Sequence, residues 1–209
     1  MIYIKTMRKT VIIFVASLLF LSCSPQRFDY KYKLTKPNES EALAYSDNKV
    51  DITIDVRESY LDLKIQNYSD RPLKIIWDEA SFVKNGEAQK IIHKNVKFID
   101  KEKVQAPTVI PVNSFVLEMV QPIDDIKFKT TSYGRNGISS YWSSRPIFRP
   151  YAGTSSPKYV DKFLRPQIGS RIALYLPIEY NGKKLEYLFE IVVTDIWLTK
   201  GKKSKSLIY

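Results

Sequence analysis

The chain has 209 residues, with 33 Lys and Arg against 22 Asp and Glu, so its formal net charge is +11 at neutral pH. Its hydrophobic content of 44% and aromatic content of 13% suffice for a packed core and exclude a disordered chain. It contains one cysteine and one histidine, which excludes an internal disulfide bond and a zinc site built from several Cys and His ligands.

The first 22 residues have the pattern of a secretion signal. A basic segment without acidic residues precedes the apolar run VIIFVASLLFL at 11–21. A charged segment, an apolar run of about 7–15 residues and a small residue are typical of signal peptides, whereas a membrane span needs about 20 apolar residues. The pattern is also complete when the chain starts at Met7 instead of Met1. The basic residues are Lys5, Arg8 and Lys9.

The single cysteine ends this apolar run. Phe20-Leu21-Ser22-Cys23 resembles the lipobox of bacterial lipoproteins, with Phe20 where that family usually has Leu. The resemblance implies cleavage before Cys23, a diacylglycerol on its sulfur, an N-acyl group on its nitrogen, and no other cofactor. Two or three acyl chains make attachment to a membrane effectively permanent. The alternative is an ordinary signal peptide followed by an incidental free thiol, which would be an unusual leftover in an exported chain.

The residue after Cys23 indicates which membrane holds the protein. In enterobacterial lipoproteins an Asp there resembles a retention signal for the inner membrane, so Ser24 favours the outer membrane, facing the periplasm. Without residues 1–22 the chain keeps 30 basic and 22 acidic residues, a net charge of about +8. In an exported protein this charge favours anionic lipid headgroups or acidic envelope polymers over nucleic acid, and a merely solvated surface is the alternative.

The exported part divides into three segments. Residues 23–48 are expected to form a tether with a possible edge strand at 28–34, and a fully flexible tether would span roughly 30 Å. Residues 49–198 are expected to form one β domain. The tail at 199–209 is basic, and we interpret it as a solubilising end or an electrostatic docking segment.

Alternation of apolar and polar residues predicts strands throughout 49–198. Asn-Gly pairs at 85–86 and 181–182 predict hairpin turns, because this pair tolerates the positive φ of tight turns. One helix is expected at 158–164, ending before Pro166. The expected strands are at 50–56, 61–65 and 73–77, in hairpins at 81–92 and 172–193, and in short runs at 108–110 and 115–120.

Seven to nine short strands predict an all-β fold, an immunoglobulin-like antiparallel β-sandwich. The order of strand, Ile65-Gln66-Asn67-Tyr68-Ser69 turn and Trp77-bearing strand resembles small immunoglobulin-like domains of bacterial envelope lipoproteins, over residues 49–125. The resemblance implies a binding or assembly module. It transfers no functional residues, because the pattern describes core and turns.

No catalytic or metal site is indicated. We interpret His93 as an ordinary surface or strand-end residue, since no nucleophile elbow supports a Ser–His–Asp triad. Neighbouring carboxylates at Asp78-Glu79 and Asp124-Asp125 would point to opposite faces of a strand and form no hydrolytic pair. The protein is therefore expected not to be an enzyme. The alternative is a carbohydrate- or peptidoglycan-active enzyme whose carboxylates are brought together by the fold.

The segment 130–157 is the candidate binding surface. It is too long for an ordinary connection and too aromatic for a disordered linker, and Tyr, Trp and Arg dominate interface hot spots. As a loop, it either buries its rings over an open end of the sandwich or presents them to an envelope protein, an anionic envelope polymer or a sugar. The candidate residues are Tyr133, Arg135, Tyr141, Trp142, Arg145, Phe148, Arg149 and Tyr151.

Overall fold

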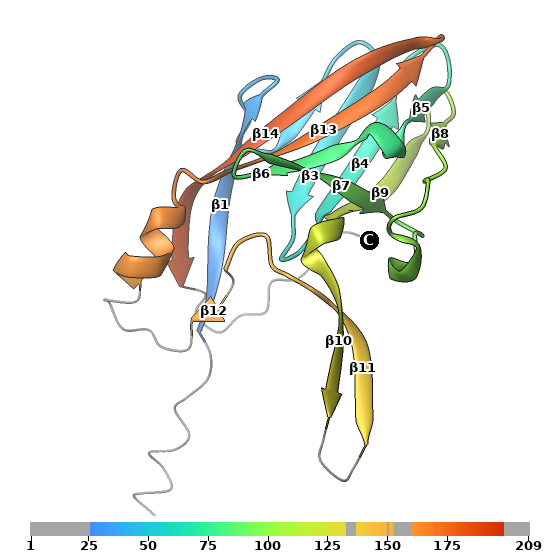
Figure 1. Cartoon of the computed structure of the whole chain (residues 1–209). Coiled ribbons are helices and arrows are strands. Elements are labelled where there is room, and N and C mark those ends of the chain that lie inside the picture. The colour runs from blue at the N-terminus through green and yellow to red at the C-terminus, as the bar shows by residue number, and fades with distance from the viewer. Residues whose placement is uncertain (1–25, 133–136, 150, 153–159, 199–209) are drawn as a thin grey trace, which may run out of the picture.

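A computed structural model describes residues 26–132, 137–149, 151–152 and 160–198 (Figure 1). In this part of the chain the fold is all-β and every strand pairing is antiparallel, which confirms the expected fold class. The strands are β1 (Gln26–Lys36), β2 (Ala44–Ser46), β3 (Val50–Val56), β4 (Leu61–Asn67), β5 (Leu73–Ile75), β6 (Ser81–Lys84), β7 (Glu87–His93), β8 (Thr108–Ile110), β9 (Phe115–Pro122), β10 (Ile126–Ser132), β11 (Ile138–Ser144), β12 (Tyr151–Ala152), β13 (Arg171–Tyr180) and β14 (Lys183–Leu198).

Twelve of these strands form one continuous sheet that folds over into a sandwich. Its order is β12-β1-β14-β13-β6-β7-β9-β4-β3-β2, and off this path β5 pairs with β13 and β8 pairs with β5. Side chains from both halves meet in one core, so β1, β14 and β13 form one layer and β4, β3 and β2 the other (Figure 1). The expected seven to nine strands undercount the described ones, because β2 and β12 have only two or three residues and β10 and β11 were not expected as strands.

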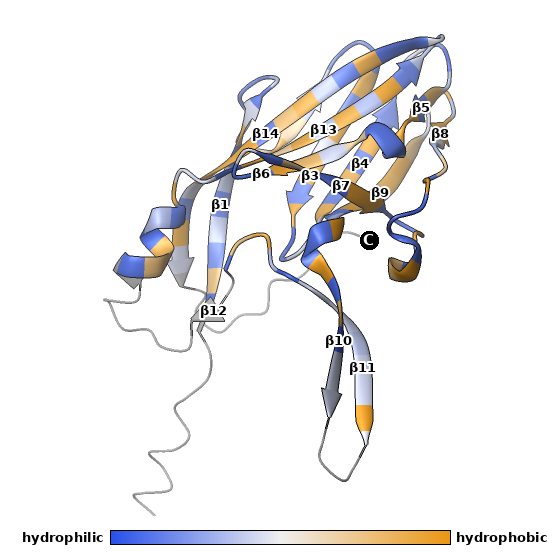
Figure 2. Ribbon diagram, in the orientation of Figure 1, coloured by the Kyte–Doolittle hydropathy of each residue, from blue (hydrophilic) through white to orange (hydrophobic). Residues whose placement is uncertain are grey.

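Alternation along the strands produces this core, as the orange and blue stripes in Figure 2 show. In β3 the side chains of Val50, Ile52 and Ile54 are at most 3% exposed, while Thr53 and Asp55, which alternate with them, are exposed. Since burial of one such apolar side chain contributes about 1.5–3 kcal/mol, this pattern fixes which face of each strand turns inward.

Both predicted Asn-Gly turns are confirmed. Asn85 and Gly86 join β6 to β7 with φ of 54° and 82°, and Asn181 and Gly182 join β13 to β14 with φ of 50° and 72°. Positive φ at both central residues matches the right-handed twist of the flanking strands, which is why this pair marks tight hairpins.

One local expectation is wrong. Trp77 does not extend β5 but begins the 3-10 turn η2 (Trp77–Glu79), which also removes the adjacent Asp78 and Glu79 from any strand.

The expected short helix is present. The π-helical turn η6 (Val160–Leu164) ends at Leu164 as expected, and a separate 3-10 turn, η7 (Arg165–Gln167), follows it. Proline is tolerated there because the first residues of a helical turn need no N–H donor.

The segment expected as a tether is part of the sandwich from Gln26 onward. The edge strand predicted at 28–34 lies within β1, which pairs with β14 from Phe28–Leu198 to Lys36–Glu190. Gln26 follows Cys23, which lies outside the described residues, by three positions. Three residues span at most about 10 Å, so the link between Cys23 and the sandwich is much shorter than the expected tether.

Candidate functional site

Strands β10 and β11 form a two-stranded hairpin that projects from the sandwich (Figure 1); we call it the arm. Its register places Phe128 opposite Trp142, Lys129 opposite Tyr141, and Ser132 opposite Ile138. The expectation of a loop over 130–157 is therefore wrong for 130–132 and 138–144, which are strand. The arm belongs to neither layer, so no core imposes alternation on its sequence.

The arm exposes large apolar side chains. The exposed fractions are 57% for Phe128, 74% for Ile138, 47% for Tyr141 and 37% for Trp142. Trp142 contacts Phe128 edge-on with ring centroids 5.2 Å apart, and Phe98 of the 3-10 turn η3 (Phe98–Asp100) at 5.9 Å. Apolar surface gathered on an element that contributes little to a core is typical of a contact surface.

The arm is also basic. From Ile126 to Pro157 the sequence has no Asp or Glu, and Lys127 and Lys129 are exposed. Because side chains alternate along a strand, Phe128, Trp142 and Ile138 share one face of the arm, while Lys127, Lys129 and Tyr141 share the other. The basic residues of this stretch are Lys127, Lys129, Arg135, Arg145 and Arg149.

Buried polar groups fasten the base of the arm. Asp125, at the end of the 3-10 turn η4 (Ile123–Asp125), is 5% exposed and lies 3.8 Å from both Lys84 Nζ and Arg145 Nε. The backbone N–H of Arg145 donates to the Asp125 carbonyl at 2.8 Å. Lys101 Nζ donates to the carbonyls of Ile123 and Ile126 at 2.8 and 3.1 Å. Arg145 is therefore part of the joint between arm and sandwich.

The residues after the arm pack against the sandwich. Ile147 is 3% exposed, and its backbone N–H donates to the Glu58 carbonyl at 2.7 Å. The ring of Phe148 lies 5.5 Å from Tyr30 and 5.8 Å from Tyr32, and the Tyr30 hydroxyl donates to the Arg149 carbonyl at 2.6 Å. Packing against the sandwich and exposure for binding, the two roles expected of this segment, thus fall to different parts of it. Residues 147–149 pack against the sandwich, and the arm is exposed.

The side chains of three candidate residues lie outside the described part of the structure. Tyr133 and Arg135 lie outside the described residues. Tyr151 belongs to β12, where its backbone pairs with Arg27, but its side chain lies outside the described part of the structure.

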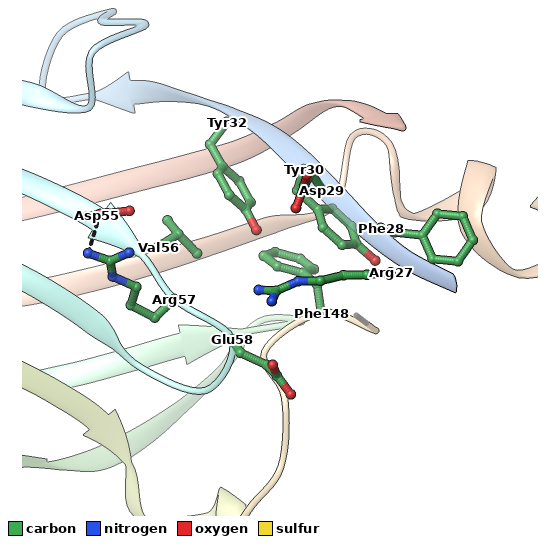
Figure 3. A pocket seen from close by; sticks show the side chains of 10 residues that line it. All are labelled: Arg27, Phe28, Asp29, Tyr30, Tyr32, Asp55, Val56, Arg57, Glu58 and Phe148. Carbon is green, nitrogen blue, oxygen red and sulfur yellow. Dashed lines mark ion pairs between the residues drawn. The ribbon is translucent and has the colours of Figure 1, made fainter. Parts of the chain in front are cut away.

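A pocket of about 260 Å³ lies where the start of β1 meets the turn after β3 (Figure 3). Arg57 bonds to Asp55 at 2.8 Å and to Asp62 at 2.7 Å. Burial raises the pKa of Asp55, against the opposing effect of Arg57, and burial also raises the pKa of the Tyr32 hydroxyl. A pocket lined by aromatic and charged side chains can bind a small polar molecule. The lining residues are Arg27, Phe28, Asp29, Tyr30, Tyr32, Asp55, Val56, Arg57, Glu58 and Phe148.

Two of the three carboxylates that line this pocket diverge. Figure 3 shows Asp55 turned to Arg57, and Glu58 pointing away from it on another part of the rim. A glycoside hydrolase needs two carboxyl groups that face one bond across a cleft. Asp55 and Glu58 do not have this arrangement.

A buried polar cluster was missed from the sequence. His93 ends β7, which confirms its interpretation as a strand-end residue, and its side chain is only 12% exposed. Its Nδ1 lies 3.4 Å from Oε2 of Glu118, whose side chain is 8% exposed. The alternation of β9 could have predicted this cluster. Glu118 stands between Val116 and Val120 at an inward position of the strand, and a carboxylate at such a position needs a buried partner.

The fold and the arm together define an all-β sandwich protein with one projecting aromatic and basic hairpin. No protein-family model, no curated protein and no solved structure matches the chain. Among the described residues, no cluster of three or more His, Cys, Asp or Glu side chains is arranged to hold a metal ion. In the same part of the chain, no helix has the length and apolar character needed to span a membrane.

Proposed function

We propose that this protein is a lipid-anchored, non-enzymatic binding or assembly module of the bacterial cell envelope. Acyl chains on Cys23 hold it to a membrane, in our proposal the outer membrane, and it faces the periplasm. Support for the anchor comes from the signal-like first 22 residues and the lipobox-like Phe20-Leu21-Ser22-Cys23.

The observation that carries the binding role is the exposure of the arm. Phe128, Tyr141 and Trp142 are at least 37% exposed, and the stretch from Ile126 to Pro157 that carries Lys127 and Lys129 contains no Asp or Glu. We infer that the arm holds an envelope component that carries negative charge. The alternative, a carbohydrate- or peptidoglycan-active enzyme, draws on the carboxylates of the pocket, and the divergence of Asp55 and Glu58 supports the binding role instead.

The anchor is tested by labelling growing cells with radioactive palmitate. The wild-type chain should take up label and sediment with membranes, whereas Cys23→Ser should lose the label and stall or be released. Normal processing and membrane retention of Cys23→Ser would rule out the lipid anchor.

The binding role is tested by photo-crosslinking in intact cells. A photoreactive residue at Tyr141 on the arm should give adducts with an envelope component. The matched control is Phe115, which is 55% exposed at the opposite end of β9 from the arm. Absence of any reproducible adduct at position 141, or equal adducts at both positions, would favour a purely structural lipoprotein without a specific contact.

A further inference from the structure

The start of β1 and the base of the arm lie at the same end of the sandwich. Arg27 pairs with Tyr151, and Arg27 lines the same pocket as Phe148, which follows the last residue of β11 by four positions. Figure 1 shows the arm projecting from the body toward the side where β1 begins. A membrane that holds Cys23 would therefore lie on the side toward which the arm points.

The lengths are compatible with contact between the arm and that membrane. The three-residue link from Cys23 to Gln26 spans at most about 10 Å, whereas the seven residues of β10 extend over about 20 Å. An acylated Cys23 lies at the bilayer surface, so the arm is long enough to reach that surface across the gap left by the link.

The side chains of the arm suit a lipid headgroup layer. Trp and Tyr favour the boundary between water and hydrocarbon, because each combines an apolar ring with a polar group. Lys127 and Lys129 add positive charge, and each basic residue near an anionic bilayer strengthens attachment about fivefold. Phe128 and Ile138 supply apolar surface that is more than half exposed.

We propose that the arm docks onto the anionic lipid surface of the membrane that anchors the protein, as a second attachment point beside the acylated Cys23. This proposal rests on the proposed lipid anchor and names the envelope component that the arm contacts. Two attachment points fix the orientation of the sandwich, which an anchor alone would leave free to rotate.

The test uses residues 24–209 without acyl chains, a form that keeps every described strand and whose folding is checked by its melting transition. This protein should sediment with phosphatidylcholine vesicles that contain phosphatidylglycerol, and much less with phosphatidylcholine alone. Lys127→Glu combined with Lys129→Glu should weaken binding by about tenfold or more. Arg71→Glu combined with Lys183→Glu makes the same charge change at the Asn181–Gly182 end of the sandwich and should weaken binding by less than about threefold.

A second measurement places the arm in the bilayer. In the variant Trp197→Phe, Trp142 is the exposed tryptophan, since Trp77 is 1% exposed. Brominated lipids should then quench its fluorescence. Phe128→Ser should lower vesicle binding, while Phe115→Ser, which removes an equally exposed ring elsewhere, should not.

Three results would overturn the proposal: no binding to phosphatidylglycerol vesicles, equal losses in the two charge variants, or an unquenched Trp142. A specific protein adduct from position 141 in cells would also overturn it in favour of a protein partner. None of these results affects palmitate labelling at Cys23, so failure of the lipid contact and failure of the anchor are told apart.

Discussion

The imidazole of His93 lies flat against the indole of Trp77, with ring centroids 4.6 Å apart and planes inclined by 8°. Trp77 Nε1 donates to Thr108 Oγ1 at 2.8 Å, and Thr108 Oγ1 donates to Glu118 Oε1 at 3.3 Å. With His93 Nδ1 3.4 Å from the other Glu118 oxygen, one buried carboxyl group connects β7, β8, β9 and η2.

We expect His93 and Glu118 to depend on each other. Either His93→Leu or Glu118→Leu alone leaves one buried polar group without its partner and should lower the free energy of unfolding by about 3 kcal/mol. The double variant should lose less than the sum of the two single losses, because neither group is then left unpaired. Urea unfolding of the four proteins measures this coupling, and strictly additive losses would contradict it.

Asn67 should be among the most sensitive polar residues of the sandwich. It is fully buried, and its Nδ2 donates to the carbonyls of Arg71 and Ile110 at 2.8 and 3.0 Å, while its Oδ1 accepts from the Ser69 N–H at 2.8 Å. Asn67→Ala should lower the free energy of unfolding by about 2–3 kcal/mol, measured by urea unfolding, since these groups lose their partner. The exposed control Asn48→Ala should change it by less than about 0.5 kcal/mol.

Asp47 should make stability depend on acid pH. Burial opposes its charge, but hydrogen bonds from the N–H groups of Val50 and Lys49 and from the Tyr187 hydroxyl hold the pKa of its carboxyl below the ordinary value. A lowered pKa means that the stabilisation is complete above the unfolded-state pKa of about 4 and is lost as pH falls through the folded-state pKa.

The unfolding midpoint in urea, followed from neutral to acid pH, checks this expectation. Asp47→Asn should be less stable than wild type at neutral pH and should lose less stability on acidification. The control Asn48→Ala, which removes a neighbouring side chain that does not titrate, should keep the wild-type pH profile. An unchanged profile for Asp47→Asn would show that these hydrogen bonds do not favour the charged carboxyl.

The arm should be removable without unfolding the sandwich. Replacing residues 129–141 by Asn-Gly keeps Phe128 and Trp142 opposite each other, and this change should leave the melting temperature nearly unchanged. Ile147→Ala, three residues after β11, should by contrast lower the free energy of unfolding by about 2–3 kcal/mol, because Ile147 is buried in the main core. A comparable loss on trimming the arm would assign it a packing role.

The layers of the sandwich could be predicted from sequence because one buried face imposes a two-residue period. Val50–Val56 was predicted with its observed bounds for this reason. The same physics explains why the sequence predicts a loop where the arm lies. Phe128 and Trp142 lie outside the main core, and the residues beyond them on that face are Thr130 and Ser140, so no alternation of apolar and polar residues arises.

Which residues form the cluster around His93 could not be predicted from sequence, because this depends on which distant strands pair. His93 meets Glu118 because β7 and β9 pair with His93 opposite Val120, across 27 positions of sequence. The pocket likewise requires β1 and the turn after β3 to come together, although nothing in either segment specifies the other.

The length of β14 sets the distance between the Asn181–Gly182 turn and the start of β1. Its 16 residues extend over about 50 Å, and its last residue, Leu198, pairs with Phe28 at the start of β1. The opposite end carries the Asn181–Gly182 turn. If Cys23 is held in a bilayer as proposed, β14 would place this turn tens of ångströms from the lipid surface, within reach of structures that a protein lying flat on the membrane could not touch.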